Sequence, residues 1–253
     1  MFPITSKINR RQFLTGSLGA IAASRFGPGI ASAREITQNY PEPLRDPASY
    51  RFYVPAASKT GQYAHYTCEF DAAWAVMKTF NVDVTLDQQI AAIGHDLAIE
   101  PYYLEPAGGV VIYGGDINNY FSGNYETNFL ARTRGKAMRK VFEAFDLPVR
   151  TVKNRKEIEQ CLRKQRLIWI KTTVDFKPWV PATWITQTGE KYPAVLGNDH
   201  AVIVMGCDDN VVLIRDVLGP TSTNYERPYE YEVPWDQFLA CWAAQGSDGL
   251  AVG

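Results

Sequence analysis

Two β-rich runs near the C-terminus restrict the fold of this chain more than any other feature. They cover residues 200–205 and 211–216, and an Asp-Asp-Asn turn at 208–210 lies between them. Apolar runs separated by such a turn predict an antiparallel β-hairpin. In a hairpin, the start of the first strand lies beside the end of the second. We therefore expect His200 and Asp216 at one end of a sheet, where a β-bulge absorbs any offset in register.

A second feature is the segment 61–80, which places Cys68 at the start of a predicted helix. Its apolar residues have the spacing of a helix that is buried on one face: Phe70, Ala73, Trp74, Met77 and Phe80. We expect Thr67 to be the N-cap, with Cys68 in the first turn, where free N–H groups and the helix dipole favour a thiolate. The alternative is that Cys68 is a small buried apolar residue.

The rest of the chain predicts an α+β fold in one domain. Further helices are expected near 85–93, 137–145, 154–162 and 233–239, and strands near 50–55 and 167–170. Two segments lack periodicity, 94–133 and 175–199, and both are rich in aromatic residues. We expect long loops there. The first is either a layer over the core or a cleft wall, and the second, which contains Trp184, overhangs a groove.

The N-terminal segment has the features of an export signal. Residues 9–14, Asn-Arg-Arg-Gln-Phe-Leu, resemble the twin-arginine motif, and a weakly apolar run and an Ala-Ser-Ala site at 31–33 follow. The expected organisation is a signal peptide at 1–33, a linker at 34–49 and a folded domain at 50–253. The mature protein is then periplasmic or extracellular. Its predicted start has no cysteine for a lipid anchor, and no apolar run is long enough to span a membrane.

Charge and cysteine usage narrow the classes of partner. Residues 34–253 contain 22 basic and 27 acidic residues, a net charge of −5, which disfavours nucleic acid or an anionic membrane as the main partner. No cofactor motif or zinc-ligand spacing is present.

If Cys68 is a nucleophile, it stays free, and the three cysteines that remain cannot all form disulfides with one another. At least one of them is therefore expected as a buried thiol: Cys161, Cys207 or Cys241.

The spacing of four polar residues indicates nucleophilic catalysis. Gln62 precedes Cys68 by six residues, and His200 follows Cys68 by 132. Asp216 follows His200 by 16 residues. The Cys-to-His separation falls in the range of roughly 130–150 residues that papain-like enzymes show. Taken singly, each residue also has a structural interpretation. His200 could be a hydrogen-bonded polar residue at the start of a strand, and Asp216 could be a residue that forms a turn.

The chain resembles the C39-like branch of the papain-like cysteine peptidases. The resemblance spans residues 52–242 and is carried by Gln62 and Cys68 and by the run 199–208 with Asp216. It implies a helical N-terminal part, led by the cysteine helix, packed on a C-terminal antiparallel sheet. It also implies Cys68 as nucleophile, His200 as base and acid, Asp216 orienting His200, and Gln62 as a donor to the oxyanion.

Glu69 departs from that family pattern, which has glycine after the cysteine. A neighbouring carboxylate opposes a thiolate unless it points away, and its bulk narrows the cleft. We expect Glu69, Trp184 and Asp199 to contact substrate. The leading hypothesis is an exported cysteine peptidase that acts on peptides or proteins. An acyltransferase using the same acyl-enzyme and a non-catalytic peptide-binding module are the alternatives.

Overall fold

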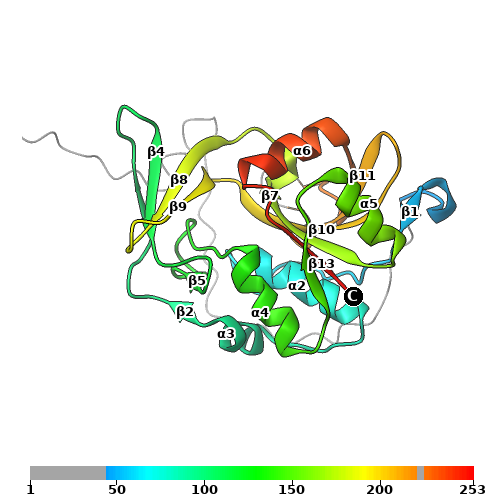
Figure 1. Cartoon of the computed structure of the whole chain (residues 1–253), viewed down its shortest axis with the longest axis horizontal. Coiled ribbons are helices and arrows are strands. Elements are labelled where there is room, and N and C mark those ends of the chain that lie inside the picture. Colours follow the sequence, from blue (N-terminus) through cyan, green and yellow to red (C-terminus); the bar gives the residue numbers. More distant parts are fainter. Residues whose placement is uncertain (1–43, 221–224) are drawn as a thin grey trace, which may run out of the picture.

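An antiparallel sheet forms the centre of the molecule (Figure 1). In the computed structural model, which describes residues 44–220 and 225–253, its strand order is β12-β11-β10-β7-β13-β6, and β1 pairs with β10. The strands are β1 (Phe52–Tyr53), β6 (Val149–Thr151), β7 (Leu167–Thr173), β10 (Asp199–Cys207), β11 (Val211–Arg215), β12 (Glu230–Pro234) and β13 (Gly249–Val252). Strand β7 is buried along its whole length, as its apolar run predicts.

The predicted hairpin is confirmed as strands β10 and β11. They pair antiparallel, and the register shifts between Val204, which faces Ile214, and Gly206, which faces Leu213. The shift is a β-bulge of the kind expected from the spacing of the two ends. The start of β10 and the end of β11 therefore lie side by side at one end of the central sheet's strands.

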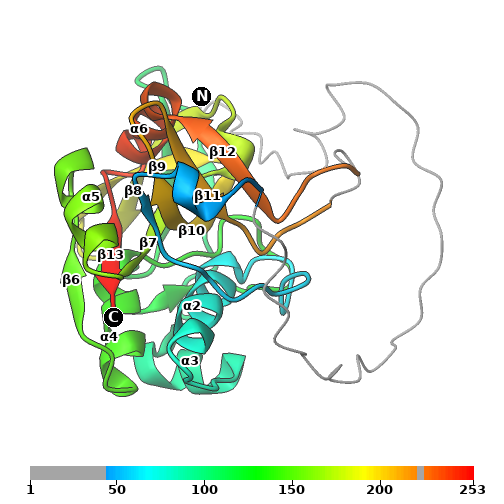
Figure 2. The same ribbon diagram turned by 90° about the vertical axis from the view of Figure 1, so that its right-hand side faces the viewer.

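Helices cover both faces of this sheet. Helices α2 (Cys68–Thr79) and α4 (Gly135–Ala144) lie on one side, and α5 (Arg155–Arg163) and α6 (Trp235–Ala244) lie on the other (Figures 1 and 2). Helix α3 (Leu86–Ile93) packs beside α4 and α2. The fold is thus mixed α+β, with an antiparallel sheet packed between helices.

Helix α2 is more deeply buried than its spacing predicts. Every residue from 68 to 77 is buried, including Glu69 and Asp71. The prediction of one buried face was wrong because α3 and α4 cover the sides of α2 that the sheet leaves open. A helix enclosed on all sides holds the residues of its first turn in a fixed position.

The helix starts differ in how they are capped. In α3 the predicted capping box is present: Gln88 N donates to Thr85 Oγ1 at 3.2 Å, and Thr85 N donates to Gln88 Oε1 at 2.8 Å. Thr67 stands at the N-cap position of α2, but its side chain caps no helix N–H. Its hydroxyl instead donates to Asp71 Oδ2 at 2.7 Å. The prediction of Thr67 as the N-cap residue is therefore confirmed by position, although its side chain makes no capping hydrogen bond.

The two expected long loops form a second sheet, which projects from the left of Figure 1. Its strands are β3 (Tyr102–Leu104), β4 (Val110–Gly114), β8 (Val180–Thr186) and β9 (Lys191–Leu196). Strand β4 pairs in parallel with β8, so the two aromatic segments complete each other. Two short strands, β2 (His95–Asp96) and β5 (Phe121–Ser122), pair beneath it. The prediction of long loops was wrong for these strands, because β4 and β8 pair with each other from separate segments and neither segment shows this pairing on its own.

The expected signal peptide and most of the expected linker lie outside the described residues. Residues 44–49 of the linker include a short 3-10 helix, Pro47–Ser49. Within residues 44–220 and 225–253, no helix is long and apolar enough to cross a bilayer. The cysteines outside the candidate site, Cys161, Cys207 and Cys241, are buried and unbridged. Burial raises the pKa of the Cys207 thiol to about 12.

Candidate active site

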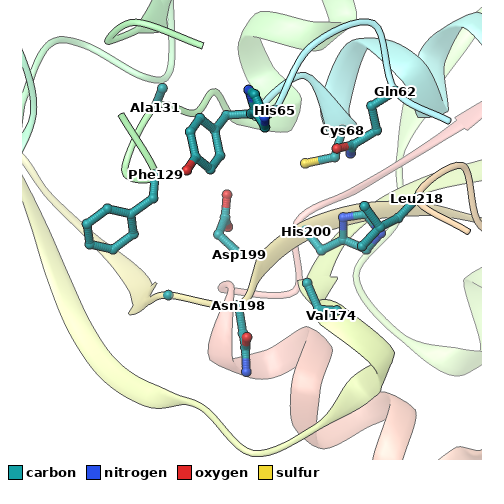
Figure 3. Close-up of a pocket in the computed structure, with 12 residues that line it drawn as sticks. Gln62, His65, Cys68, Phe129, Ala131, Val174, Asn198, Asp199, His200 and Leu218 are labelled. Atoms are coloured by element: carbon teal, nitrogen blue, oxygen red, sulfur yellow. The ribbon is translucent and has the colours of Figure 1, made fainter. Parts of the chain in front are cut away.

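A pocket opens where the start of α2 meets the start of β10 (Figure 3). Three of the four predicted catalytic residues, Gln62, Cys68 and His200, line it, and Asp216 lies behind His200. The other lining residues are His65, Tyr66, Phe129, Ala131, Val174, Gly197, Asn198, Asp199 and Leu218. Side chains separated by more than 130 residues in the sequence therefore share one cleft.

Asp71 organises the loop that carries Gln62. Its carboxylate accepts hydrogen bonds from the backbone N–H of Tyr63, at 3.0 Å, and from the hydroxyl of Thr67. It also forms a buried ion pair with Lys59. Because Lys59 and Tyr63 flank Gln62, these contacts fix the backbone of that residue relative to the first turn of α2. The pocket thus has Gln62 and Cys68 on one rigid unit.

His200 and Asp216 form a buried pair. His200 Nε2 donates to Asp216 Oδ1 at 2.8 Å, and the two side chains are 2% and 0% exposed. Asp216 Oδ2 accepts from the Tyr231 hydroxyl at 2.8 Å and from Arg227. Burial opposes ionisation of Asp216, but His200 and Arg227 outweigh it and hold the pKa of this carboxyl well below its usual range. Asp216 is therefore an anion that fixes the His200 ring through Nε2.

Sequence reasoning missed Arg227 and Tyr231. Arg227 contacts Asp216 and Asp175, and it donates to the backbone oxygen of Gly219 at 3.3 Å. Tyr231 lies on β12, a strand that the sequence pattern did not predict. No spacing rule links either residue to His200, since both act through contacts that only the folded sheet creates.

Glu69 points at the cysteine rather than into solvent. The Cys68 thiol donates to Glu69 Oε2 at 3.2 Å, and Glu69 Oε1 accepts from Lys171 Nζ at 2.5 Å. Burial and the Glu69 carboxylate raise the pKa of Cys68 well above its usual value, and Lys171 only partly opposes them. The expectation that the helix start favours a thiolate is thus wrong for this arrangement.

Lys171 is a further residue that the sequence analysis overlooked. It is 3% exposed on strand β7, between Glu69 and Asp199, and its contact with Asp199 Oδ2 is 2.7 Å. The sequence does contain a signal for this role, since Lys171 directly follows the apolar run 167–170 of a predicted buried strand. A lysine that is buried in this way requires acidic partners nearby.

The three expected substrate-contacting residues lie in different places. Asp199 lines the pocket, and its carboxylate also accepts from Gln245 Nε2 at 2.6 Å. Glu69 lies behind Cys68 and is almost fully buried. Trp184 is fully buried in the core of the second sheet, and its indole N–H donates to the Gly115 oxygen at 3.0 Å. The structure therefore places Trp184 inside the second sheet instead of in the pocket wall.

Comparison with solved structures identifies a protein with the same fold. A crystal structure of a Bacillus anthracis protein, provisionally described as a C39-like peptidase, aligns with a TM-score of 0.57 and 19% identity. The alignment covers 77% of this chain and 93% of the other. This chain shares that fold. No protein-family model and no curated protein matches the sequence. At this identity the likeness establishes the mixed α+β architecture, and the chemistry has to be argued from the site.

Proposed function

We propose that the protein is a thiol hydrolase that cleaves peptide bonds through an acyl-enzyme on Cys68. The observation that carries the proposal is the His200–Asp216 pair, 2.8 Å apart, in a pocket that also holds a cysteine at a helix start. A histidine oriented by a buried carboxylate beside a thiol is the arrangement of a general base and its nucleophile. The shared fold of a protein described as a C39-like peptidase supports the same reaction class.

The proton steps follow from the hydrogen bonds of His200. Since Nε2 donates to Asp216, Nδ1 is the ring nitrogen left to accept the Cys68 proton. The thiolate then attacks the substrate carbonyl carbon, and the imidazolium returns the proton to the leaving amine. Water, deprotonated by His200, hydrolyses the thioester and restores the thiol. Asp216 stabilises the imidazolium in both halves of the cycle.

Gln62 and the backbone N–H of Cys68 are the proposed oxyanion donors. Gln62 lines the pocket next to Cys68, on the loop that Asp71 organises (Figure 3). The N–H of a helix's first residue has no partner within the helix, so it is free to donate. Two such donors stabilise the negative charge that develops on the carbonyl oxygen.

The test compares the full-length wild type with Cys68→Ala. A thiol-directed acyl probe and a peptide library are incubated with each protein, and mass spectrometry locates the label and the cleaved bonds. We expect labelling and cleavage by the wild type only, and the buried-thiol variant Cys161→Ala should retain both. Equal inertness of wild type and Cys68→Ala would overturn the proposal.

One observation favours the alternative of a non-catalytic peptide-binding module. The raised pKa of Cys68 and its hydrogen bond to Glu69 are unfavourable for a resting nucleophile. Under this alternative the wild type binds library peptides in the pocket without cleaving them, and Cys68→Ala binds them equally well. Peptide binding by fluorescence anisotropy, measured beside cleavage, separates the two functions.

We further propose export by the twin-arginine route, on the basis of the paired arginines and the Ala-Ser-Ala site at 31–33. Replacing Arg10 and Arg11 together by lysine should retain the protein in the cytoplasm. Cell fractionation with detection of the full chain measures this. Export of the double-lysine variant at the wild-type level would contradict the proposal.

A further inference from the structure

The contact between Cys68 Sγ and Glu69 Oε2, here called the thiol latch, gives the nucleophile a partner that the proposed reaction does not use. It measures 3.2 Å, and both residues are buried. Within the described part of the chain, it is the one hydrogen bond recorded for this thiol. In Figure 3 the sulfur of Cys68 points sideways across the pocket and is not aimed at the His200 ring. The proton that His200 is to accept is thus directed at a carboxylate instead.

Glu69 is held so that it cannot turn away from the thiol. Its Oε1 accepts from Lys171 Nζ at 2.5 Å and from the backbone N–H of Thr133 at 3.2 Å. The indole N–H of Trp169 donates to the Glu69 backbone oxygen at 3.0 Å. With Oε1 engaged on the sheet side, Oε2 is the oxygen left to accept from Cys68. These contacts fix the acceptor end of the thiol latch.

The charges around the thiol come from three further elements. Lys171 on β7 lies between Glu69 and Asp199, and Arg132, on the segment before α4, lies 3.8 Å from Asp199. Burial and Glu69 raise the pKa of Cys68, Asp199 adds to this, and Lys171 opposes it. Two buried carboxylates are therefore balanced by two buried cations, and the carboxylate nearest the sulfur is Glu69. Removing the charge of Glu69 would leave one buried carboxylate against two buried cations, and this lowers the pKa of the Cys68 thiol.

We propose that Glu69 is a positioning residue that keeps Cys68 in a resting orientation, from which the side chain turns about χ1 toward His200 for reaction. In the resting orientation the proton stays on sulfur and is donated to Glu69 Oε2. After rotation into another staggered rotamer, the S–H bond breaks and the proton passes to His200 Nδ1, with no change of oxidation state. The inference rests on the proposed function for the second orientation, but the resting state of the thiol is measurable without catalysis.

The experiment measures alkylation of Cys68 by iodoacetamide from pH 6 to 11, followed by mass spectrometry of the Cys68 peptide. For the wild type we expect a midpoint above ~8.5, the value of an ordinary thiol. Glu69→Gln keeps the size of the side chain but removes its charge. We expect this variant to react about tenfold faster at pH 7, with a midpoint lower by about one unit. Glu143→Gln, at an exposed position on α4, is the matched control and should behave as the wild type.

Several outcomes would overturn the thiol latch. One is an unchanged or slower alkylation rate of Cys68 in a Glu69→Gln protein that thermal unfolding shows to be folded. Another is a wild-type alkylation midpoint at or below that of an ordinary thiol, and this result counts even if Glu69→Gln fails to fold. Alkylation that follows the expected pattern without any peptide cleavage contradicts the proposed function alone. Cleavage with equal alkylation profiles contradicts the thiol latch alone.

Discussion

His200 Nε2 and Asp216 Oδ1 lie 2.8 Å apart at the joined ends of β10 and β11. The bulge between Val204 and Gly206 offsets the two strands, and Asp216 follows the last residue of β11 directly. His200 lines the pocket and Asp216 lies behind it, and Arg227 and Tyr231 hold the second oxygen of the Asp216 carboxylate. These contacts hold the Asp216 carboxylate in the position where it accepts the hydrogen bond from the His200 ring.

Replacing Asp216 by asparagine should reduce kcat strongly with little effect on KM. The side chain keeps its size, but it loses the charge that stabilises the imidazolium and fixes the tautomer of His200. Comparable substitutions in hydrolase triads lower kcat by up to about 10⁴-fold. Steady-state kinetics on a cleaved library peptide measure the effect. Asp209→Asn, at an exposed position in the hairpin turn, is the control. A kcat near the wild-type value would contradict the role given to Asp216.

Gln62→Ala should lower kcat by about 10²–10³-fold, since it removes one of two proposed donors to the oxyanion. Because the oxyanion exists only in the transition state, KM should change little. The control is Gln187→Ala, an exposed glutamine in the turn between β8 and β9. If Gln62→Ala raised KM and left kcat intact, Gln62 would instead be a substrate-binding residue.

Acid should destabilise the wild type through Asp216. Its pKa is lowered in the folded protein, whereas an unfolded aspartate titrates near ~3.9. The ionised carboxylate therefore contributes stability that is fully present well above pH 4 and is lost as the pH falls below it toward the folded-state pKa. Urea unfolding at pH 6, 4 and 3 should show a steeper loss of unfolding free energy in the wild type than in Asp216→Asn. Parallel losses would show that Asp216 is not the group responsible.

Trp184→Phe should lower stability without changing KM for peptides. The substitution removes the hydrogen bond to the Gly115 oxygen and leaves space in the second core, at a cost of about 1–3 kcal/mol of unfolding free energy. Urea unfolding and steady-state kinetics test the two effects together. If Trp184→Phe raised KM and kept the stability of the wild type, Trp184 would be a substrate-binding residue as the sequence analysis expected.

The elements that sequence analysis predicted well are those with local signals. The hairpin of β10 and β11 follows from two apolar runs and a turn, and the capping box at Thr85 and Gln88 is visible in four residues. The sequence pattern predicts a helix at 233–239, but α6 runs from Trp235 to Ala244. The predicted range begins two residues before the helix and ends five residues short of its end, because the last turn depends on packing against the central sheet.

The second sheet and the partners of the candidate site could not be predicted in the same way. Strands β4 and β8 pair in parallel although they lie about 70 residues apart in the sequence, and neither segment alternates clearly between polar and apolar residues. The direction of the Glu69 side chain depends on Lys171, more than 100 residues away. The residues of the site were visible as a spacing pattern, but the contacts that set their ionisation exist only after the strands assemble.

The parallel pairing of β4 with β8 also determines when the protein can finish folding. During synthesis, the β3–β4 hairpin emerges long before β8 exists, so one edge of β4 stays open until about 70 more residues have been made. Gly114 then has to fit against the Trp184 ring, where an added Cβ would lie 2.1 Å from a ring carbon. Non-local closure of this kind is slow, and an open strand edge pairs readily with other chains. A chain that stalls before residue 180 should therefore be prone to aggregate through the β3–β4 hairpin.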